Sequence, residues 1–404
     1  MGHDIDRIPS SGIIRIRDLM YAVQDPYRLD QGDVSFDAPE SVKTGVRLAL
    51  DRNHTHYLPT AGVPRLRELL AAKLRAKNGV PVEDDDEVLV TNGGIHALYI
   101  TCQALLEPGD EVVVPDPEWP PAVGNIIAAR GVPVACRLHE RLGWRYDLDE
   151  LRACLTDRTR AIYLNSPNNP TGGVLAADDL AAITALARDR GLWILSDEAY
   201  EDVLYDGATH TSPASLPDAY ARTVPFYTFS KTFAITGLRL GYVAVRDEPL
   251  RERIRKVLFY TTTNVASLVQ YGGIGGLEGS PDVIEQFRAE LQARRDLFYA
   301  RIAGLGDDIL SGTIPRGAFY AFLAVGPTLA TLGRAHAEAT GVDERSVSWA
   351  VARYLIERAR IGCVPGVDFG ASGEGFVRFC FARDPRELHG ALDSLERLIA
   401  DDTR

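Results

Sequence analysis

Short apolar runs in the first part of the chain each end at a polar or glycine-rich turn. The runs of strand length lie at residues 87–90, 111–114, 161–164, 192–195 and 224–227. Their apolar residues are contiguous rather than alternating, which is typical of parallel strands covered on both faces. Helical patterns lie between them, at residues 97–106 and 176–188. Strands and helices that alternate in this way predict an α/β domain.

The pattern changes in the last part of the chain. Residues 283–303 are rich in Arg, Glu, Leu and Ala, and they predict a long amphipathic helix. Strands are expected at 317–325 and 375–382, and further helices at 346–360 and 385–399. We therefore predict a smaller α+β domain whose junction with the first lies inside the long helix. The length of 404 residues also favours two domains, because one hydrophobic core rarely supports so long a chain.

Charge and cysteine usage narrow the possible functions. The net charge of −12 disfavours nonspecific binding to nucleic acids or to anionic membranes. No apolar run approaches the roughly 20 residues of a membrane span, and the first residues lack the apolar region of a secretory signal. The five cysteines are widely spaced and form no C-x-x-C pair, which is typical of reduced thiols. We expect a cytoplasmic enzyme that acts on small molecules.

Four of the predicted strands lead into segments that can carry chemistry. These segments are Thr-Asn-Gly-Gly at 91–94, the Asn- and Pro-rich stretch at 165–172, Ser-Asp-Glu-Ala-Tyr at 196–200 and Thr-Phe-Ser-Lys at 228–231. Ligands of open α/β sheets bind at the carboxyl ends of the strands. The four segments are therefore expected to form one site.

Gly93 and Gly94 form a turn between a predicted strand and a predicted helix. Glycines let backbone N–H groups approach an anion, and a helix N-terminus favours negative charge, so a phosphate fits there. A tight strand–helix turn needs glycine as well, so the pair alone establishes no phosphate site. The chain lacks the G-x-G-x-x-G, Walker A, G-x-S-x-G and H-E-x-x-H motifs, and we expect no metal site.

Lys231 is the sharpest candidate for chemistry. It follows an apolar strand, where an unpaired cation would be costly. Desolvation and a neighbouring cation lower the pKa of a lysine and prepare its amine for Schiff-base formation. Arg239 lies on the same segment and could hold a phosphate through two hydrogen bonds. A surface lysine and arginine on a loop would explain an isolated pair of this kind equally well.

Three segments resemble the cofactor-binding motifs of the class I/II aminotransferases, which are pyridoxal-phosphate (PLP) enzymes of fold type I. They are Asn-Asn-Pro-Thr-Gly at 168–172, Ser-Asp-Glu-Ala-Tyr at 196–200, and Ser-Lys followed by Gly-Leu-Arg-Leu-Gly-Tyr within 230–242. Further matches, in the family's order, are Gly32, Tyr57, Ala61-Gly62, Leu66-Arg67, Pro108-Gly109-Asp110-Glu111, Gly317-Ala318-Phe319-Tyr320, Pro365-Gly366 and Val377-Arg378-Phe379. The resemblance covers nearly the whole chain.

The resemblance implies a role for each matched residue. Lys231 would hold PLP as a Schiff base and then carry a proton between the substrate Cα and the cofactor. Asp197 would keep the pyridine nitrogen protonated, so that PLP acts as an electron sink. Tyr200 and Asn169 would bond the phenolic oxygen of the cofactor, and Trp119 would stack on its ring.

The remaining matched residues are assigned to the phosphate and to the substrate. The phosphate would be held by Gly93, Gly94, Ile95, Thr228, Arg239 and, from the neighbouring subunit, Tyr57. Arg378 would grip the substrate α-carboxylate with two hydrogen bonds, and Gly32 and Asn169 would also lie at the substrate.

The resemblance also implies a fold, an assembly and a reaction. Residues 44–285 would form a large α/β domain with a mostly parallel seven-stranded sheet between helices, and residues 1–43 with 286–404 the smaller α+β domain. The chain would form a homodimer with active sites at the interface. An L-amino acid and a 2-oxo acid would be its substrates in a ping-pong transamination.

Two other functions fit parts of the pattern. The same PLP site also serves carbon–sulfur lyases and amino-acid synthases, so the motifs alone leave these reactions open. Aminotransferase-like domains also occur in transcription regulators that carry a DNA-binding domain ahead of them. Only about 30 residues precede Gly32 here, which leaves no room for such a domain.

The sequence departs from the family pattern at three places. Ile95 stands where relatives that prefer aspartate often carry a Lys, so we expect neutral or aromatic donors to be preferred over acidic ones. Asp33 and Val34 replace the usual Glu-Pro after Gly32, so the entrance loop is expected to differ. Glu118 replaces a common Tyr before Trp119, and the sequence offers no physical account of this change.

Overall fold

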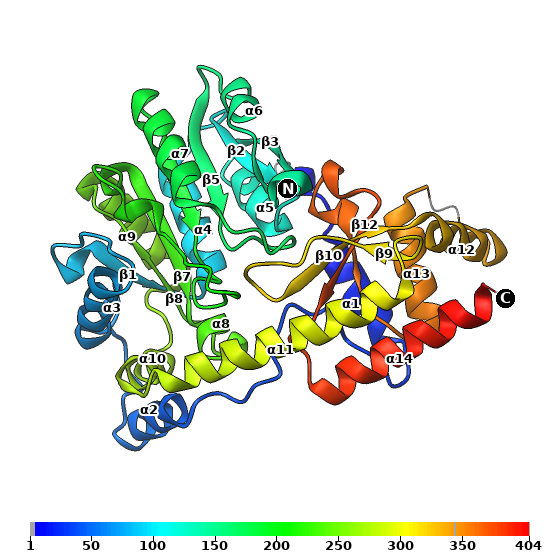
Figure 1. Ribbon diagram of the computed structural model, residues 1–404. Helices are drawn as coiled ribbons and strands as arrows, with labels where there is room; N and C mark the ends of the chain where they lie inside the picture. The colour runs from blue at the N-terminus through cyan, green and yellow to red at the C-terminus, as the bar shows by residue number, and fades with distance from the viewer. Residues whose placement is uncertain (1–4, 343–344, 404) are drawn as a thin grey trace.

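The computed structural model describes residues 5–342 and 345–403, and its larger sheet has eight strands (Figure 1). Their order across the sheet is β1-β8-β7-β6-β5-β2-β3-β4. The strands are β1 (Val88–Thr91), β2 (Glu111–Asp116), β3 (Val132–His139), β4 (Arg145–Tyr146), β5 (Thr159–Asn165), β6 (Trp193–Asp197), β7 (Thr223–Thr228) and β8 (Gly241–Ala244).

Most of this sheet is parallel, as the resemblance implied. Strands β3, β2, β5, β6 and β7 run in one direction, whereas β8 is antiparallel to both of its neighbours. The sheet has one strand more than the expected seven, because Arg145 and Tyr146 form the short β4 against the end of β3. Every residue of β1 and β2 is buried, which explains why their apolar residues are contiguous in the sequence.

Helices cover both faces of the larger sheet (Figure 1). They are α2 (Glu40–Asp51), α3 (Pro64–Ala76), α4 (Gly94–Leu105), α5 (Pro120–Ala128), α6 (Leu148–Ala153), α7 (Ala177–Asp189), α8 (Phe229–Thr232), α9 (Glu248–Thr262) and α10 (Ser267–Glu278). The helices α4, α5 and α9 share one apolar core with the strands, and α6 and α7 share another. A third cluster joins α2, α3 and α10 to the β1 edge.

The smaller sheet has four antiparallel strands in the order β11-β12-β10-β9. They are β9 (Leu310–Ser311), β10 (Tyr320–Val325), β11 (Val364–Pro365) and β12 (Phe376–Cys380). The helices beside it are α1 (Gly12–Tyr21), α11 (Asp282–Leu305), α12 (Pro327–Ala339), α13 (Val347–Ala359) and α14 (Pro385–Asp402). The N-terminal segment therefore packs with the last part of the chain, and a bridge joins Tyr27 to Ile361.

The helix α11 links the two sheets. Figure 1 shows it running from beside α10 to the smaller sheet. Ile284, near its first residue, packs with the cluster around α2 and α3, whereas Leu291, Phe298 and Ile302 belong to the core of the smaller sheet. The predicted boundary at 285/286 falls inside α11 and the one at 43/44 inside α2, and the division into two domains stays a prediction.

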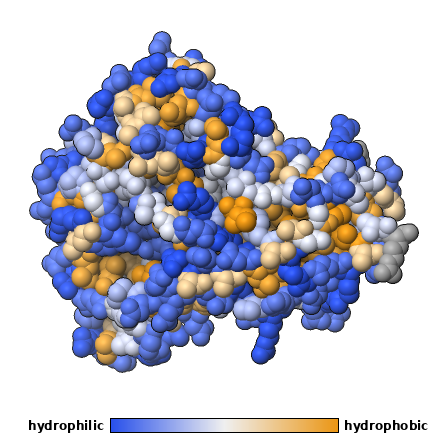
Figure 2. Space-filling view, in the orientation of Figure 1, coloured by the Kyte–Doolittle hydropathy of each residue, from blue (hydrophilic) through white to orange (hydrophobic). Residues whose placement is uncertain are grey.

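Neither the hydropathy of the surface (Figure 2) nor the helices indicate a membrane-spanning segment in the described residues. The face in Figure 2 is mostly hydrophilic, with apolar side chains gathered in smaller areas. Within residues 5–342 and 345–403, no helix is both long and apolar enough to cross a membrane.

Candidate active site

The carboxyl ends of β1, β5, β6 and β7 open into one cavity of about 470 Å³. Its other wall comes from the N-terminal segment and from the smaller sheet, so the cavity lies between the two sheets. Most of the predicted site residues line it: Gly32, Gly94, Ile95, Trp119, Asn169, Asp197, Tyr200, Thr228, Lys231, Arg239 and Arg378. The four strand-end segments thus border one cavity, and its role as the site stays a prediction.

Lys231 lies in the short helix α8, directly after β7. Thr228 caps this helix by accepting a hydrogen bond from the Ser230 amide at 3.2 Å. The Lys231 ammonium donates to the carbonyl oxygen of Gly32 at 2.6 Å. Burial lowers the pKa of Lys231 to about 8, and the Asp33 carboxylate opposes that shift. An amine with this pKa is partly neutral near physiological pH, and the neutral form is the one that attacks a carbonyl group.

Asp197 is the last residue of β6 and faces the same cavity. Its Oδ2 accepts a hydrogen bond from the Tyr163 hydroxyl at 3.0 Å, and its Oδ1 accepts one from the Ala199 amide at 3.1 Å. Burial raises the pKa of Asp197 to about 6, although both hydrogen bonds oppose the shift. A buried carboxyl held in this way gains most from a cationic partner in the cavity.

Arg378 lies in the middle of β12 and is only 2% exposed. Its Nη1 donates to Asn169 Oδ1 at 2.9 Å, and its Nη2 donates to the carbonyl oxygen of Asp30 at 2.8 Å. Its Nε is buried and has no hydrogen-bond partner within the described residues. The guanidinium is thus held through two of its five N–H groups, and the others remain for an anionic ligand.

The turn after β1 forms a cradle at the N-terminus of α4. Gly93 has a φ of 79°, and a β-carbon there would lie 2.6 Å from Arg239 Nη2. A side chain at Gly241 would meet the Gly94 amide nitrogen at 2.8 Å. Gly93 lies beneath Arg239, whereas Gly94 and Ile95 line the cavity. The Gly93 N–H donates to the Thr91 carbonyl oxygen at 2.9 Å, so the groups at the cavity that suit a phosphate are the backbone of Gly94 and Ile95 and the Arg239 guanidinium.

Two predicted aromatic residues occupy the same cavity, and a third does not. The Tyr200 hydroxyl is buried and lies 2.7 Å from the Tyr320 hydroxyl. Trp119 is half-buried and directly precedes α5. Tyr57 lies apart from the cavity, and its side chain is 88% exposed.

Sequence reasoning assigned no role to several residues that line the cavity or fix it. Asp30 supplies the carbonyl that holds Arg378, and its carboxylate pairs with Arg28 at 2.9 Å. Ile13 and Arg17 lie one helical turn apart on α1 and line the cavity mouth. Their i, i+4 spacing was the available signal, but it shows only that they share a helix face, not what the face covers.

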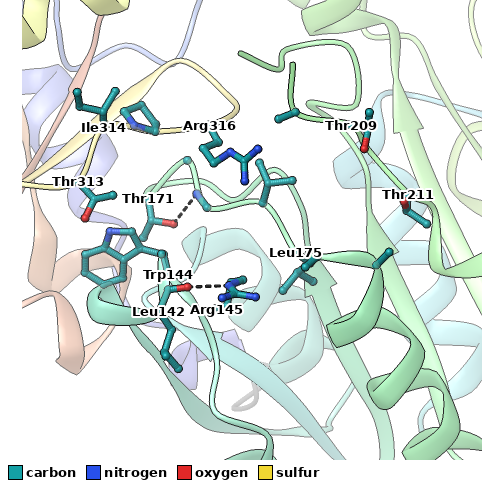
Figure 3. A pocket seen from close by; sticks show the side chains of 18 residues that line it. Leu142, Trp144, Arg145, Thr171, Leu175, Thr209, Thr211, Thr313, Ile314 and Arg316 are labelled. Atoms are coloured by element: carbon teal, nitrogen blue, oxygen red, sulfur yellow. Dashed lines mark hydrogen bonds between the residues drawn. The ribbon is translucent and has the colours of Figure 1, made fainter. Parts of the chain in front are cut away.

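A second cavity of about 510 Å³ is lined in part by the turn that contains Thr171 (Figure 3). Trp144, Arg145 and Arg316 contribute side chains to it, and Arg145 is paired with Asp179 at 2.7 Å. Within the described part of the chain, its lining contains no lysine, histidine, cysteine or carboxyl group. The cavity around Lys231 is therefore the candidate active site.

Comparisons with known proteins agree with this geometry. The family described as "Aminotransferase class I and II" matches residues 24–395. The chain belongs to the class I and II aminotransferases. An aspartate aminotransferase of Pyrococcus abyssi is 34% identical over 99% of this chain and 98% of its own length. The aromatic-amino-acid aminotransferase 2 of Thermococcus litoralis is also 34% identical, over 98% of this chain and 97% of its own length.

Solved structures of aminotransferases share the fold. An aspartate aminotransferase from Thermus thermophilus, solved with maleate, superposes with a TM-score of 0.89 at 32% identity, covering 98% of this chain and 99% of that one. The protein is thus an aminotransferase, which moves an amino group between an amino acid and a 2-oxo acid. These full-length matches decide between transamination and the other reactions that the motifs left open.

The lowered pKa of Lys231 predicts how its amine would react with PLP, the cofactor of class I and II aminotransferases. The neutral amine is the reactive form, so the rate at which apoprotein captures PLP should rise with pH and reach half its maximum near pH 8. Because the Asp33 carboxylate raises the pKa of Lys231, Asp33→Asn should move the midpoint to lower pH. Stopped-flow absorbance across a pH series measures both midpoints.

The matched control is Asp18→Asn, which removes an exposed carboxylate paired with Arg17 at the cavity mouth. This variant should keep the midpoint of the unaltered protein. A midpoint near that of free lysine, or an upward shift in Asp33→Asn, would contradict the assignment of the lowered pKa to burial.

Proposed function

We propose that the cavity around Lys231 binds pyridoxal phosphate and carries out both half-reactions of transamination there. The observation that carries the proposal is that the buried amine of Lys231 and the buried carboxyl of Asp197 face one cavity. PLP presents an aldehyde and a basic ring nitrogen, for which an amine and a carboxylate are the fitting partners. Two further observations support the fit: the cradle at Gly93 and Gly94, and the buried, unpartnered Nε of Arg378.

The described residues suggest how the cofactor would be held. Lys231 would bind it covalently, Asp197 would pair with the ring nitrogen, and Trp119 would cover a face of the ring. Tyr200 and Asn169 would bond the phenolic oxygen. The phosphate would be held by Gly93, Gly94, Ile95, Thr228, Arg239 and the partner subunit's Tyr57.

The chemistry then divides between the cofactor and three side chains. When bound, PLP would supply an electron sink that makes the C–H bond at the substrate Cα acidic. Arg378 fixes the substrate carboxylate, which orients the Cα–H bond toward Lys231. The freed Lys231 amine takes this proton as a general base and returns it as a general acid. The cations of Arg378 and Arg239 favour the neutral amine that this step requires.

We also propose a homodimer and a cytoplasmic location. Thr60, three residues after the exposed Tyr57, shares a surface hollow with Phe259 and Tyr260. Phe259 is 49% exposed and Tyr260 79% exposed, and exposed apolar side chains of this size favour a subunit interface. The five cysteines are free thiols, which supports a reducing compartment.

Replacing Lys231 by Ala tests the proposal directly. The variant should retain no PLP after borohydride reduction, and its half-reaction with an amino acid should slow by about 10²- to 10⁴-fold or more, because a general base is lost. Single-turnover absorbance and mass spectrometry of the reduced protein measure the two effects. Lys43→Ala, on the surface helix α2, should behave like the unaltered protein. Borohydride labelling of a residue other than Lys231 would reject the proposal.

Replacing Tyr57 by Phe tests the shared site. The dimer should persist in light scattering, while the dissociation constant of PLP should rise by about tenfold or more, since hydrogen bonds to charged groups are strong. Tyr21→Phe removes another exposed hydroxyl, on α1, and should leave PLP affinity unchanged. A monomeric mass, or equal affinity of Tyr57→Phe and the unaltered protein, would contradict the shared site.

Replacing Ile95 by Lys tests the proposed donor preference. Ile95 is 38% exposed at the cavity, and we propose that it favours neutral or aromatic donors. A cation there should raise kcat/KM for aspartate relative to phenylalanine by about tenfold or more. Ile95→Leu, which keeps the apolar character, should leave the ratio within about twofold. A clear aspartate preference in the unaltered enzyme would refute the proposal.

A further inference from the structure

Glu118 precedes Trp119 in the chain, at the position where a Tyr is common. Its side chain is buried next to the residues that line the active-site cavity. It lies two residues after β2, and its side chain is only 1% exposed. Its backbone N–H donates to the carbonyl oxygen of Phe369 at 2.7 Å, which fixes the segment against the smaller sheet. Glu118 does not line the cavity itself, so any part it plays in the reaction acts through its neighbours.

The Glu118 carboxyl group joins Asn165, which lines the cavity, to Asn168, which precedes a residue that lines it. Its Oε1 accepts a hydrogen bond from Asn165 Nδ2 at 2.6 Å, and its Oε2 accepts one from Asn168 Nδ2 at 3.1 Å. Asn165 ends β5 and lines the cavity, and Asn168 directly precedes Asn169, which holds Arg378. A single buried group therefore determines the direction of two neighbouring amides.

Asn168 passes this constraint on to the turn that carries Asn169. Its Oδ1 accepts hydrogen bonds from the Thr171 amide at 3.1 Å and from the Thr171 hydroxyl at 2.7 Å. The Asn168 side chain is thus fixed at both ends, by Glu118 and by Thr171. Asn169, between them in the chain, is presented to the cavity by a turn with little freedom.

The second amide that Glu118 holds is the side chain of Asn165. Asn165 is 6% exposed, and its Oδ1 is buried without a hydrogen-bond partner in the described part of the chain. Because Glu118 binds Nδ2, it also fixes the direction of the buried Oδ1 in the wall of the cavity. A buried acceptor of this kind costs free energy unless a bound group donates to it.

Burying a carboxyl group at this position costs free energy. Burial raises the pKa of Glu118 well above its ordinary value, and the charge of Asp197 acts in the same direction. The Tyr common in relatives would fill the space with a largely apolar ring at lower cost. The hydrogen bonds to Asn165 and Asn168 offset the cost of burying Glu118, and they indicate that it orients these two amides.

We propose that Glu118 is a positioning residue for transamination, which holds the Asn165 and Asn168 amides so that the turn after β5 presents Asn169 to the cavity and to the cofactor bound there. This inference rests on the proposed function of the cavity. It adds a group outside the cavity lining, and it gives the departure from the family pattern a physical role.

A double-mutant cycle between Glu118 and Asn165 tests the proposal. The variants are Glu118→Leu, Asn165→Ala and the double variant, and the readouts are the dissociation constant of PLP and the pH midpoint of the bound cofactor's visible absorption. Glu118→Leu should weaken PLP binding by about tenfold and shift the midpoint, because two buried amides lose their acceptor. In the Asn165→Ala background, the same change should cost less than about threefold, because the two residues act as one unit.

Two control variants separate positioning from general stability. Glu111→Gln alters a buried carboxylate at the opposite end of β2, where it binds Thr156 at 2.5 Å, and should leave both readouts unchanged. Glu118→Gln keeps a group that can accept from one amide, so its PLP affinity should lie between those of Glu118→Leu and the unaltered protein. Circular dichroism of each apoprotein establishes folding, and the cycle is run with Glu118→Gln if Glu118→Leu does not fold.

The outcomes distinguish this inference from the function on which it rests. Unaltered protein that binds no PLP would refute the proposed function. Unaltered protein that binds PLP, together with a folded Glu118→Leu variant that binds it equally well, would overturn the positioning role alone. Additive effects of Glu118→Leu and Asn165→Ala would overturn it too, because the two residues would then act independently.

Discussion

The burial of the Lys231 amine is the constraint on which the rest of the site depends. A lone ammonium group in a protein interior costs on the order of several kcal/mol, so its surroundings must supply compensation. Here the carbonyl oxygen of Gly32 accepts its hydrogen bond at 2.6 Å, and the ring of Phe319 lies 5.4 Å away. Gly32 has to be a glycine, because a β-carbon there would lie 2.3 Å from the Tyr320 hydroxyl. The hydrogen bond between Lys231 and Gly32 therefore joins the end of β7 to the N-terminal segment, which packs with the smaller sheet.

The charged residues around this cavity come from two different sheets. Asp197 ends β6, Lys231 follows β7 and Arg239 precedes β8, so all three come from the larger sheet. Arg378 comes from β12 of the smaller sheet and reaches across to Asn169 at 2.9 Å. Groups that would bind the cofactor and the group that would bind the substrate carboxylate thus belong to different parts of the fold. Only their arrangement around one space gives the enzyme its chemistry.

Much of the fold and most of the lining could be predicted from the sequence. Fully buried parallel strands leave contiguous apolar runs, so β2, β5, β6 and β7 were visible, and the strand-end rule then located Asp197 and Lys231. The strand β3 was missed because it lies near the edge and alternates between exposed and buried residues, and β8 because it has only four residues and begins with Gly241.

Other features depend on contacts between residues far apart in the chain, which no local pattern records. The carbonyl of Asp30 binds Arg378 across 348 positions, and Glu118 meets Asn165 across 47. Tyr57 matches its family motif, yet it is exposed in the single chain, so its place at the site depends on the proposed homodimer.

The continuity of α11 has a mechanical consequence. Its first turns pack with the cluster around α2 and α3, and its later turns pack into the core beside β12, without a break from Asp282 to Leu305. Any change in the angle between the two sheets must therefore bend α11 or loosen the packing at one end of this helix. The width of the cleft between Arg378 and Lys231 is coupled in this way to the bending of α11, although none of the residues of this helix lines the cavity.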